Sequence, residues 1–193
     1  QVDHQVNVDF PLAGLKVLDL CIILAGPTCG RSLAELGADV IKIDDPSRGG
    51  VLYHHDINRG KRSILIDLKT PGGLDVFWQL VDDADVIVQN YRSGVVEQLG
   101  IDYESIKARK PNVIYVSLNA FGDQGPWEYQ PGYEEVVQAL TGMQTRFGGN
   151  DRPILWPYGV VNDYGTGFAG AFGVVLALIV KASTGKGQHV TSA

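Results

Sequence analysis

The chain has 193 residues, a formal net charge of −6 and a hydrophobic fraction of 45%. A chain of this size and apolar content can bury a substantial core, so we expect one large domain. The acidic balance argues against nucleic acid as a partner, because a phosphate backbone is bound through an excess of Lys and Arg. Cys21 and Cys29 are too few for a disulfide scaffold or a four-cysteine zinc site, which fits a reducing, cytoplasmic compartment.

The chain ends and the longest apolar run bear on targeting. The run from Gly167 to Val180 is shorter than the roughly 18 residues expected of a membrane-spanning helix, so it predicts a buried helix and no membrane span. The chain begins with Gln and shows no basic-plus-apolar leader, so we expect no export signal and interpret the sequence as a fragment. Its last residues, "QHVTSA", are typical of the beginning of a strand.

Short β-branched runs alternate with helical patterns along the chain. The predicted strands cover residues 16–20, 39–43, 63–68, 85–90 and 113–118, and the predicted helices cover 28–36, 71–82 and 103–110. Strands separated by crossover helices predict an α/β fold, a Rossmann-like parallel sheet with flanking helices. Ligands of such sheets bind beyond the carboxyl ends of the strands, which makes candidate site segments of residues 21–27, 44–62, 89–94 and 119–132.

Beyond residue 119 the pattern changes to Gly/Pro-rich loops. One loop leads into a helix near Tyr133, and residues 147–153 form another loop before the apolar helix. The earlier stretch "LAGPTCGRSLAELGADVIKID" has glycines after a strand and Asp44 after the next, but it lacks G-x-G-x-x-G. A strand-to-helix turn at Gly26 and Pro27 is therefore favoured over a nicotinamide site.

Three polar features could carry chemistry. Arg59, Lys61, Arg62 and Lys69 flank a strand and could hold a phosphate or simply form a solvated edge. Adjacent His54 and His55 lack further metal ligands nearby in the sequence, so no metal site is expected.

The third feature is Asp163, which precedes the apolar helix. It could cap that helix by accepting backbone N–H bonds. It could equally face a ligand, because the small residues Gly165, Gly167, Ala169 and Gly170 allow close approach to the backbone.

Several segments taken together resemble a known family, the class III CoA-transferases (CaiB/BaiF). They are "PLAGLKVLDL…LAGP", "ELGADVIKID", "NRGKRSILIDLKTPGG", "ADVIVQNYRSGVVEQLGIDYESIKARKPNVIYVSL", "FGDQGPW…PGYEEVVQALTGM" and "TGKGQHV". The resemblance runs from Pro11 to the last residue. It implies the N-terminal half of a longer protein, with residues 11–193 forming an incomplete CoA-binding domain and residues 1–10 a leader or interdomain linker.

The resemblance also implies a reaction. Asp163 falls on the family's catalytic aspartate, which moves CoA from an acyl-CoA to a small carboxylic acid through an aspartyl-CoA thioester. Coenzyme A is then a substrate, no metal takes part, and the full-length protein is an interlocked homodimer. Tyr133 stands where the transferase branch has tyrosine and the racemase branch a catalytic histidine, so a transferase is favoured. Tyr133 would donate a hydrogen bond or pack on the pantetheine, or it is simply a buried aromatic at a helix start.

The family's CoA contacts are carried over residue by residue. They fall on Leu24, Ala25, Ile66, Asp67, Leu68, Lys69, Asn90, Tyr91, Arg92 and Gln98. The family's glycine-rich loop over the intermediate is absent from this chain, so we expect the chain alone to be inactive. Two alternatives stay open: a racemase-type isomerase, and a non-catalytic CoA-binding half of a larger or tandem protein.

Overall fold

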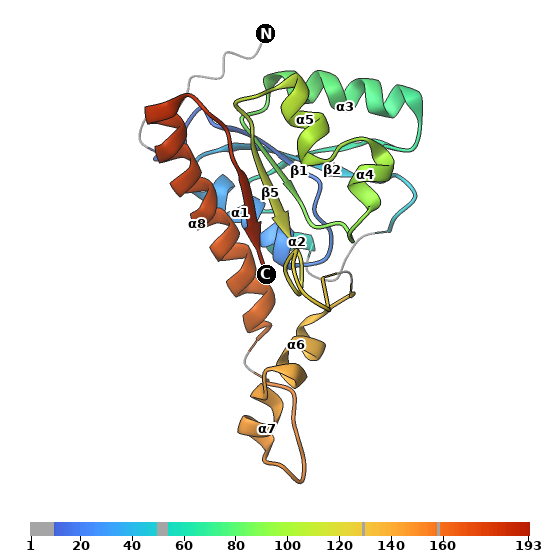
Figure 1. The fold of residues 1–193 in the computed structure, drawn as a ribbon, viewed down its shortest axis with the longest axis vertical. Coiled ribbons are helices and arrows are strands. Elements are labelled where there is room, and N and C mark those ends of the chain that lie inside the picture. The colour runs from blue at the N-terminus through green and yellow to red at the C-terminus, as the bar shows by residue number, and fades with distance from the viewer. Residues whose placement is uncertain (1–9, 50–53, 129, 158) are drawn as a thin grey trace.

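The computed structural model describes residues 10–49, 54–128, 130–157 and 159–193 (Figure 1). The proposed leader at residues 1–10 therefore lies outside the described residues except for Phe10. The strands are β1 (Lys16–Asp19), β2 (Asp39–Asp44), β3 (Arg62–Leu65), β4 (Val86–Gln89), β5 (Ile114–Leu118) and β6 (His189–Ser192). The helices are α1 (Ala25–Glu35), α2 (His54–Ile57), α3 (Pro71–Asp83), α4 (Val95–Leu99), α5 (Tyr103–Arg109), α6 (Glu134–Leu140), α7 (Met143–Gly148) and α8 (Val161–Thr184).

The strands form one parallel six-stranded sheet in the order β3-β2-β1-β4-β5-β6, which confirms the predicted α/β fold. The chain builds outward from β1 to β3, returns to the other side of β1 for β4, and continues to β6. The order therefore reverses between β1 and β4, and a crevice opens at such a reversal beyond the strand ends.

Alternating strand residues supply two hydrophobic cores, one on each face of the sheet. Val86 and Val88 face the layer formed by α1 and α8, whereas Ile87 faces the layer formed by α3 and α5. Figure 1 shows α8 along one side of the sheet and α3 with α5 on the other. Because both faces are covered, the central strands are apolar throughout, and this made them recognisable in the sequence.

Local chemistry sets the ends of the helices. Thr70 accepts a hydrogen bond from the Gly73 N–H at 3.1 Å, and Pro71 begins α3, where its missing N–H costs nothing. Gly26 and Pro27 lie inside the first turn of α1, so the prediction of a separate turn before a helix at 28–36 was wrong by three residues. Proline is tolerated there for the same reason as in α3.

Strand β3 also differs from its prediction. It ends at Leu65, and Ile66 and Leu68 leave the strand but remain buried in the core beneath α3. Their apolar character reflects this burial and not strand pairing. The strand expected at the end of the chain is confirmed as β6, which pairs with β5.

Helix α8 is buried on one face only, which corrects the prediction of a buried helix. Its packed face is made of small residues and one valine, namely Gly167, Gly170, Ala171, Val174 and Ala177. Its other face exposes Phe168, Phe172, Leu176, Ile179 and Val180. The helix has 24 residues because it also includes residues 161–166 before the apolar run and 181–184 after it, and by length and composition it could cross a membrane. One such helix is weak evidence of a span, since core helices pass the same test.

Candidate functional site

A cleft of about 430 Å³ opens at the carboxyl ends of β1, β4 and β5. It is lined by the loops that follow these strands and by the first turns of α6 and α8. Most of the lining comes from residues 22–25, 90–93, 118–120, 130–134, 161–163 and 165–166. The cleft thus lies at the reversal of strand order, within two of the four loop segments expected from sequence and partly within a third.

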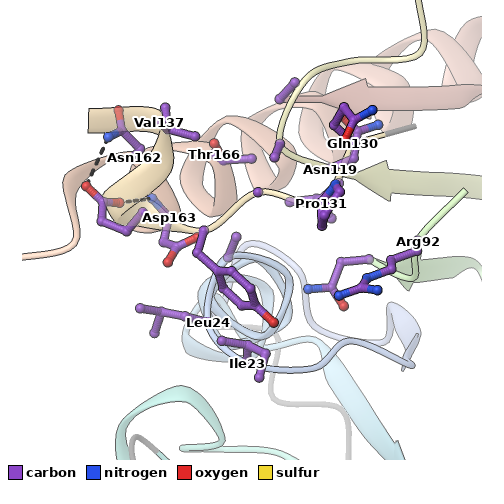
Figure 2. Close-up of a pocket in the computed structure, with 18 of the residues that line it drawn as sticks. Ile23, Leu24, Arg92, Asn119, Gln130, Pro131, Val137, Asn162, Asp163 and Thr166 are labelled. Atoms are coloured by element: carbon purple, nitrogen blue, oxygen red, sulfur yellow. Dashed lines mark hydrogen bonds between the residues drawn. The ribbon is translucent and has the colours of Figure 1, made fainter. Parts of the chain in front are cut away.

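Asp163 lies in the first turn of α8 and lines this cleft (Figure 2). The residue preceding the helix is Val160, and the helix start has no capping side chain of its own. The capping interpretation of Asp163 was therefore wrong: its carboxylate is free to face the cleft. The first turn of a helix also favours a negative charge, because its backbone N–H groups and dipole point there.

The cap of α8 comes instead from α6. Glu134 Oε2 accepts a hydrogen bond from the Asp163 backbone N–H at 2.8 Å, and Glu134 Oε1 accepts one from Asn162 Nδ2 at 2.9 Å. Gln138 Nε2 donates to Glu134 Oε1 at 2.7 Å, and Gln138 Oε1 accepts from the Trp156 backbone N–H at 2.8 Å. Glu134 and Gln138 are both buried, so this network fixes the turn that carries Asp163 from inside the protein.

Sequence reasoning did not identify Glu134. In the sequence, Glu134 is a carboxylate next to Tyr133 at the start of a predicted helix. A carboxylate at that position usually indicates only a favourable interaction with the dipole of its own helix. The helix it caps begins 27 residues later, at Val161. A Gln four positions after Glu134 was the remaining hint of a paired network.

The electrostatics of Asp163 suit a reactive carboxylate. Burial and, to a smaller extent, the nearby charges of Glu134 and Glu135 together raise its pKa to about 6. A carboxyl group with this pKa is mostly ionised at pH 7 yet more basic than a solvated one. Open space lies beside Gly165, because a Cβ at this position would meet nothing within 4 Å.

The loop after β1 is held by Asn90. The Asn90 side chain accepts from the Ile22 N–H and donates to the Ile22 carbonyl, each at 2.7 Å. Gly26 permits this approach, since a Cβ there would lie 2.9 Å from Asn90 Cγ and 2.5 Å from Cys21 Sγ. Asn90 was predicted to contact CoA; in the structure its amide is used to shape the wall of the cleft.

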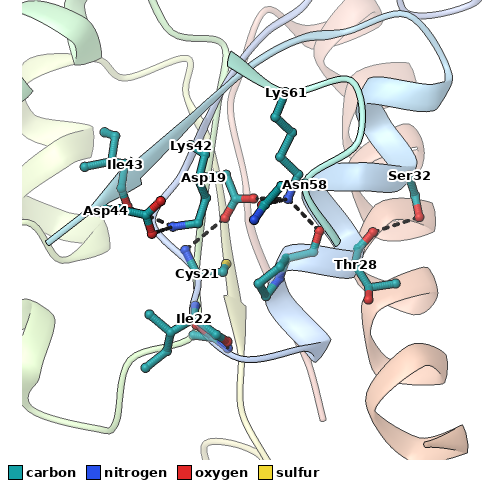
Figure 3. A network of polar contacts seen from close by, with 12 residues as sticks. Asp19, Cys21, Ile22, Thr28, Ser32, Lys42, Ile43, Asp44, Asn58 and Lys61 are labelled. Atoms are coloured by element: carbon teal, nitrogen blue, oxygen red, sulfur yellow. Dashed lines mark hydrogen bonds and ion pairs between the residues drawn. The ribbon is translucent and has the colours of Figure 1, made fainter. Parts of the chain in front are cut away.

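A buried ion pair supports the same loop from below (Figure 3). Lys61 Nζ lies 2.6 Å from Asp19 Oδ2 and donates to the Pro27 carbonyl at 2.8 Å, and both charged side chains are almost fully buried. The other Asp19 oxygen accepts from the Cys21 N–H at 2.9 Å. Cys21 and Cys29 are buried free thiols.

The basic cluster around β3 has one buried member and three at the surface. Lys61 is buried, and Arg59, Arg62 and Lys69 each pair with a carboxylate, on Glu35, Asp39 and Asp45 respectively. The side chains of Arg59, Arg62 and Lys69 are 59%, 58% and 68% exposed, so these three form the solvated edge, whereas the buried Lys61 does not belong to it. In the described part of the chain no group of His, Cys, Asp and Glu side chains could hold a metal ion.

The structure brings most of the predicted site residues together. Those lining the cleft are Leu24, Ala25, Asn90, Tyr91, Arg92, Tyr133 and Asp163. Tyr133 is 53% exposed, so its interpretation as a buried aromatic was wrong.

The remaining predicted contacts do not line the cleft. Ile66 and Leu68 belong to the core, and Gln98 is exposed on α4. Asp67 accepts from the Lys69 N–H at 3.0 Å, and the Lys69 ammonium pairs with Asp45 at 3.0 Å.

The chain is an α/β protein in which a carboxylate on the first turn of a helix faces a cleft, and the cleft lies where the strand order of the parallel sheet reverses. Such a site can offer an acidic group to a bound ligand. The model of CoA-transferase family III matches residues 12–193, and the chain belongs to this family.

Relatives and solved structures agree with this assignment. The chain is 36% identical to a succinate–glutarate CoA-transferase of Agrobacterium fabrum, over 95% of this chain and 50% of that protein. It is 37% identical to a formyl-CoA:oxalate CoA-transferase of Rhodopseudomonas palustris, over 94% of this chain and 46% of that protein. A CaiB/BaiF family protein from Brucella suis superposes with a TM-score of 0.88 at 39% identity, over 94% of this chain and 52% of that one. The chain thus spans about half the length of the curated relatives it matches.

Proposed function

We propose that this chain carries the nucleophile of an acyl-CoA:carboxylate CoA-transferase, with Asp163 forming an aspartyl-CoA thioester. The observation that carries the proposal is the Asp163 carboxylate, uncapped and facing the cleft, with its backbone fixed by Glu134. Membership of a family whose named relatives transfer CoA supports the same reaction here.

The reaction proceeds by four exchanges at carbonyl carbons. An Asp163 oxygen attacks the donor thioester carbonyl, which breaks the C–S bond, releases CoA thiolate and forms an acyl-aspartyl anhydride. The thiolate then attacks the aspartyl carbonyl, giving the aspartyl-CoA thioester and the free donor acid. An acceptor carboxylate attacks this thioester to form a second anhydride, and the released thiolate attacks its acceptor carbonyl. The new acyl-CoA leaves, and Asp163 is a carboxylate again.

The chemistry of the site fits these steps. Asp163 attacks as an anion, so no general base is required, and a pKa of about 6 leaves it ionised at neutral pH. Leu24, Ala25 and Val161 give the cleft apolar walls suited to pantetheine, and Arg92 supplies a cation beside them. We propose that backbone groups of residues 66–69 and the exposed side chain of Gln98, all outside the cleft, contact the nucleotide end of CoA.

Intact-protein mass spectrometry of the natural full-length protein tests the proposal. Incubation with a panel of acyl-CoAs should leave a covalent CoA adduct that maps to Asp163. The adduct should vanish in Asp163→Ala, while Asp75→Ala, which removes an exposed carboxylate on α3 outside the cleft, should retain it. An adduct on another residue, or none with any donor on a folded and CoA-binding protein, would contradict the assignment.

The isomerase alternative makes a different prediction. Racemisation requires exchange of the α-hydrogen of the acyl group, and two groups must swap that proton. Tyr133 is exposed in the cleft, and a phenol is a poor general base at neutral pH. We therefore expect no solvent deuterium at the α-carbon of a recovered 2-methylacyl-CoA. Rapid deuterium incorporation would favour the isomerase.

A further inference from the structure

Ile23, in the loop between β1 and α1, has an unusual backbone. Its φ angle is 69°, and among the described residues it is the one non-glycine residue with positive φ. The left-handed region is unfavourable for residues with a Cβ and especially so for β-branched ones, whereas glycine adopts it freely. The chain therefore holds Ile23 in a strained conformation at the edge of the cleft.

The surroundings of Ile23 over-determine this conformation. On one side, Asn90 grips both the N–H and the carbonyl of Ile22 at 2.7 Å. On the other side, the Leu24 side chain is only 2% exposed and α1 begins at Ala25. With both neighbours fixed, Ile23 has no freedom to relax, which is the circumstance in which strain persists at functional sites.

The strained backbone presents an apolar side chain to the cleft. Ile23 is 43% exposed and lines the same cleft as Asp163, and Figure 2 shows it beside Leu24 on the side of the cleft toward which the Asp163 side chain extends. A glycine would make the same turn without strain and without exposing apolar surface to water. Ile23 thus carries two unfavourable features at once. Contact with a bound apolar group would offset the second of them.

We propose that Ile23 determines specificity for the acyl group of the CoA thioester, as a rigid apolar wall beside the reacting carbonyl. This inference rests on the proposed function, because it places the acyl carbonyl at Asp163. The wall contacts small acyl groups and obstructs those branched next to the carbonyl. Replacing Ile23 by glycine keeps the backbone and removes the wall, so binding should shift toward branched acyl groups.

Thermal unfolding of Ile23→Gly and Ile23→Ala tests the strain. Both variants remove the wall, but only glycine relieves the positive φ. We expect Ile23→Gly to unfold about 2 to 4 °C above Ile23→Ala. Equal melting temperatures, or a more stable alanine variant, would overturn the assignment of a strained conformation.

Isothermal titration calorimetry tests the specificity in the Asp163→Asn background, where no covalent step intervenes. The ratio of Kd for isobutyryl-CoA to Kd for acetyl-CoA should fall about tenfold on Ile23→Gly, the size expected for a few carbon atoms in an apolar pocket. Ile23→Val should change it less, and Ile179→Ala, which truncates an exposed side chain on α8 outside the cleft, should not change it. An unchanged ratio in Ile23→Gly would overturn the proposal. If the protein with native Asp163 formed no CoA adduct, Asp163 would be rejected as the nucleophile. The ratio of the two Kd values would still decide the role of Ile23.

Discussion

The buried carboxylate of Glu134 accepts a hydrogen bond from the backbone N–H of Asp163 across 2.8 Å. One carboxylate therefore holds the turn that presents another, although α7 and a loop separate α6 from α8 in the chain. Two acidic groups brought this close also influence each other's ionisation, because like charges disfavour the charged form. Glu134 therefore fixes the position of Asp163 and also affects its ionisation.

Glu134→Gln should lower the pKa of Asp163 from about 6 toward its ordinary value, because it removes the charge with the larger of the two raising effects. A ¹³C NMR titration of the Asp163 carboxyl group measures this directly. Glu135→Gln is the matched control, since Glu135 contributes the smaller effect and its variant should give a smaller decrease. A pKa that does not move in Glu134→Gln, or that moves more in Glu135→Gln, would show that the charge of Glu134 does not act on Asp163.

Asp163→Asn should stabilise the fold at neutral pH. The pKa of Asp163 is about 6 in the folded state and near 3.9 in an unfolded chain. Between these values the folded state binds more protons, so its stability decreases as pH rises through this window. Thermal melts should show Asp163→Asn above the wild type at pH 7, with the difference closing below about pH 4. A difference that is independent of pH would be inconsistent with a raised pKa.

Lys61→Met should destabilise the protein strongly. The Asp19 and Lys61 side chains are 0% and 1% exposed, and removing the lysine leaves an uncompensated buried charge. Such losses cost about 3–5 kcal/mol, measurable by urea denaturation. Arg62→Met breaks a pair with Asp39 whose side chains are about half exposed, and it should cost no more than about 1 kcal/mol. Similar costs for the two variants would argue against the buried pair as a support of the loop.

Gly167→Ala should separate α1 from α8. A Cβ at Gly167 would lie 2.5 Å from the Ala25 carbonyl oxygen and 2.7 Å from Thr28 Cβ, so the helices must move apart. Gly165→Ala, two positions earlier on the same helix, meets nothing within 4 Å and should be stabilising by up to about 1 kcal/mol through helix propensity. Thermal unfolding distinguishes the two, and an equal gain in both would contradict the close packing.

The fold was largely predictable from sequence because its central strands are short runs buried on both faces, as at 86–89 and 114–118. The predictions were wrong where apolar residues are buried without pairing in a strand, or are not buried at all. Ile66 and Leu68 are as apolar as strand residues but lie beyond the end of β3. The apolar run of α8 predicted a buried helix, whereas Phe172 and Ile179 on it are exposed among the described residues.

The site was predictable only in part. Asp163 and the loops after β1 and β4 follow from strand order and from the family resemblance. The role of Glu134 depends on the approach of α6 to α8, and the burial of Lys61 depends on Asp19, a residue 42 positions earlier in the chain. Contacts of this kind arise from tertiary packing and leave no local pattern to read.

The most direct test of the central claim follows oxygen atoms through a single turnover of the natural full-length protein. An acceptor acid labelled with ¹⁸O in both carboxyl oxygens should pass one of them to Asp163, because the second anhydride breaks on the acceptor side and leaves the bridging oxygen with the enzyme. Peptide mapping by mass spectrometry should then find one ¹⁸O on Asp163. Formation of acceptor acyl-CoA with no label on Asp163 would contradict the aspartyl-CoA mechanism.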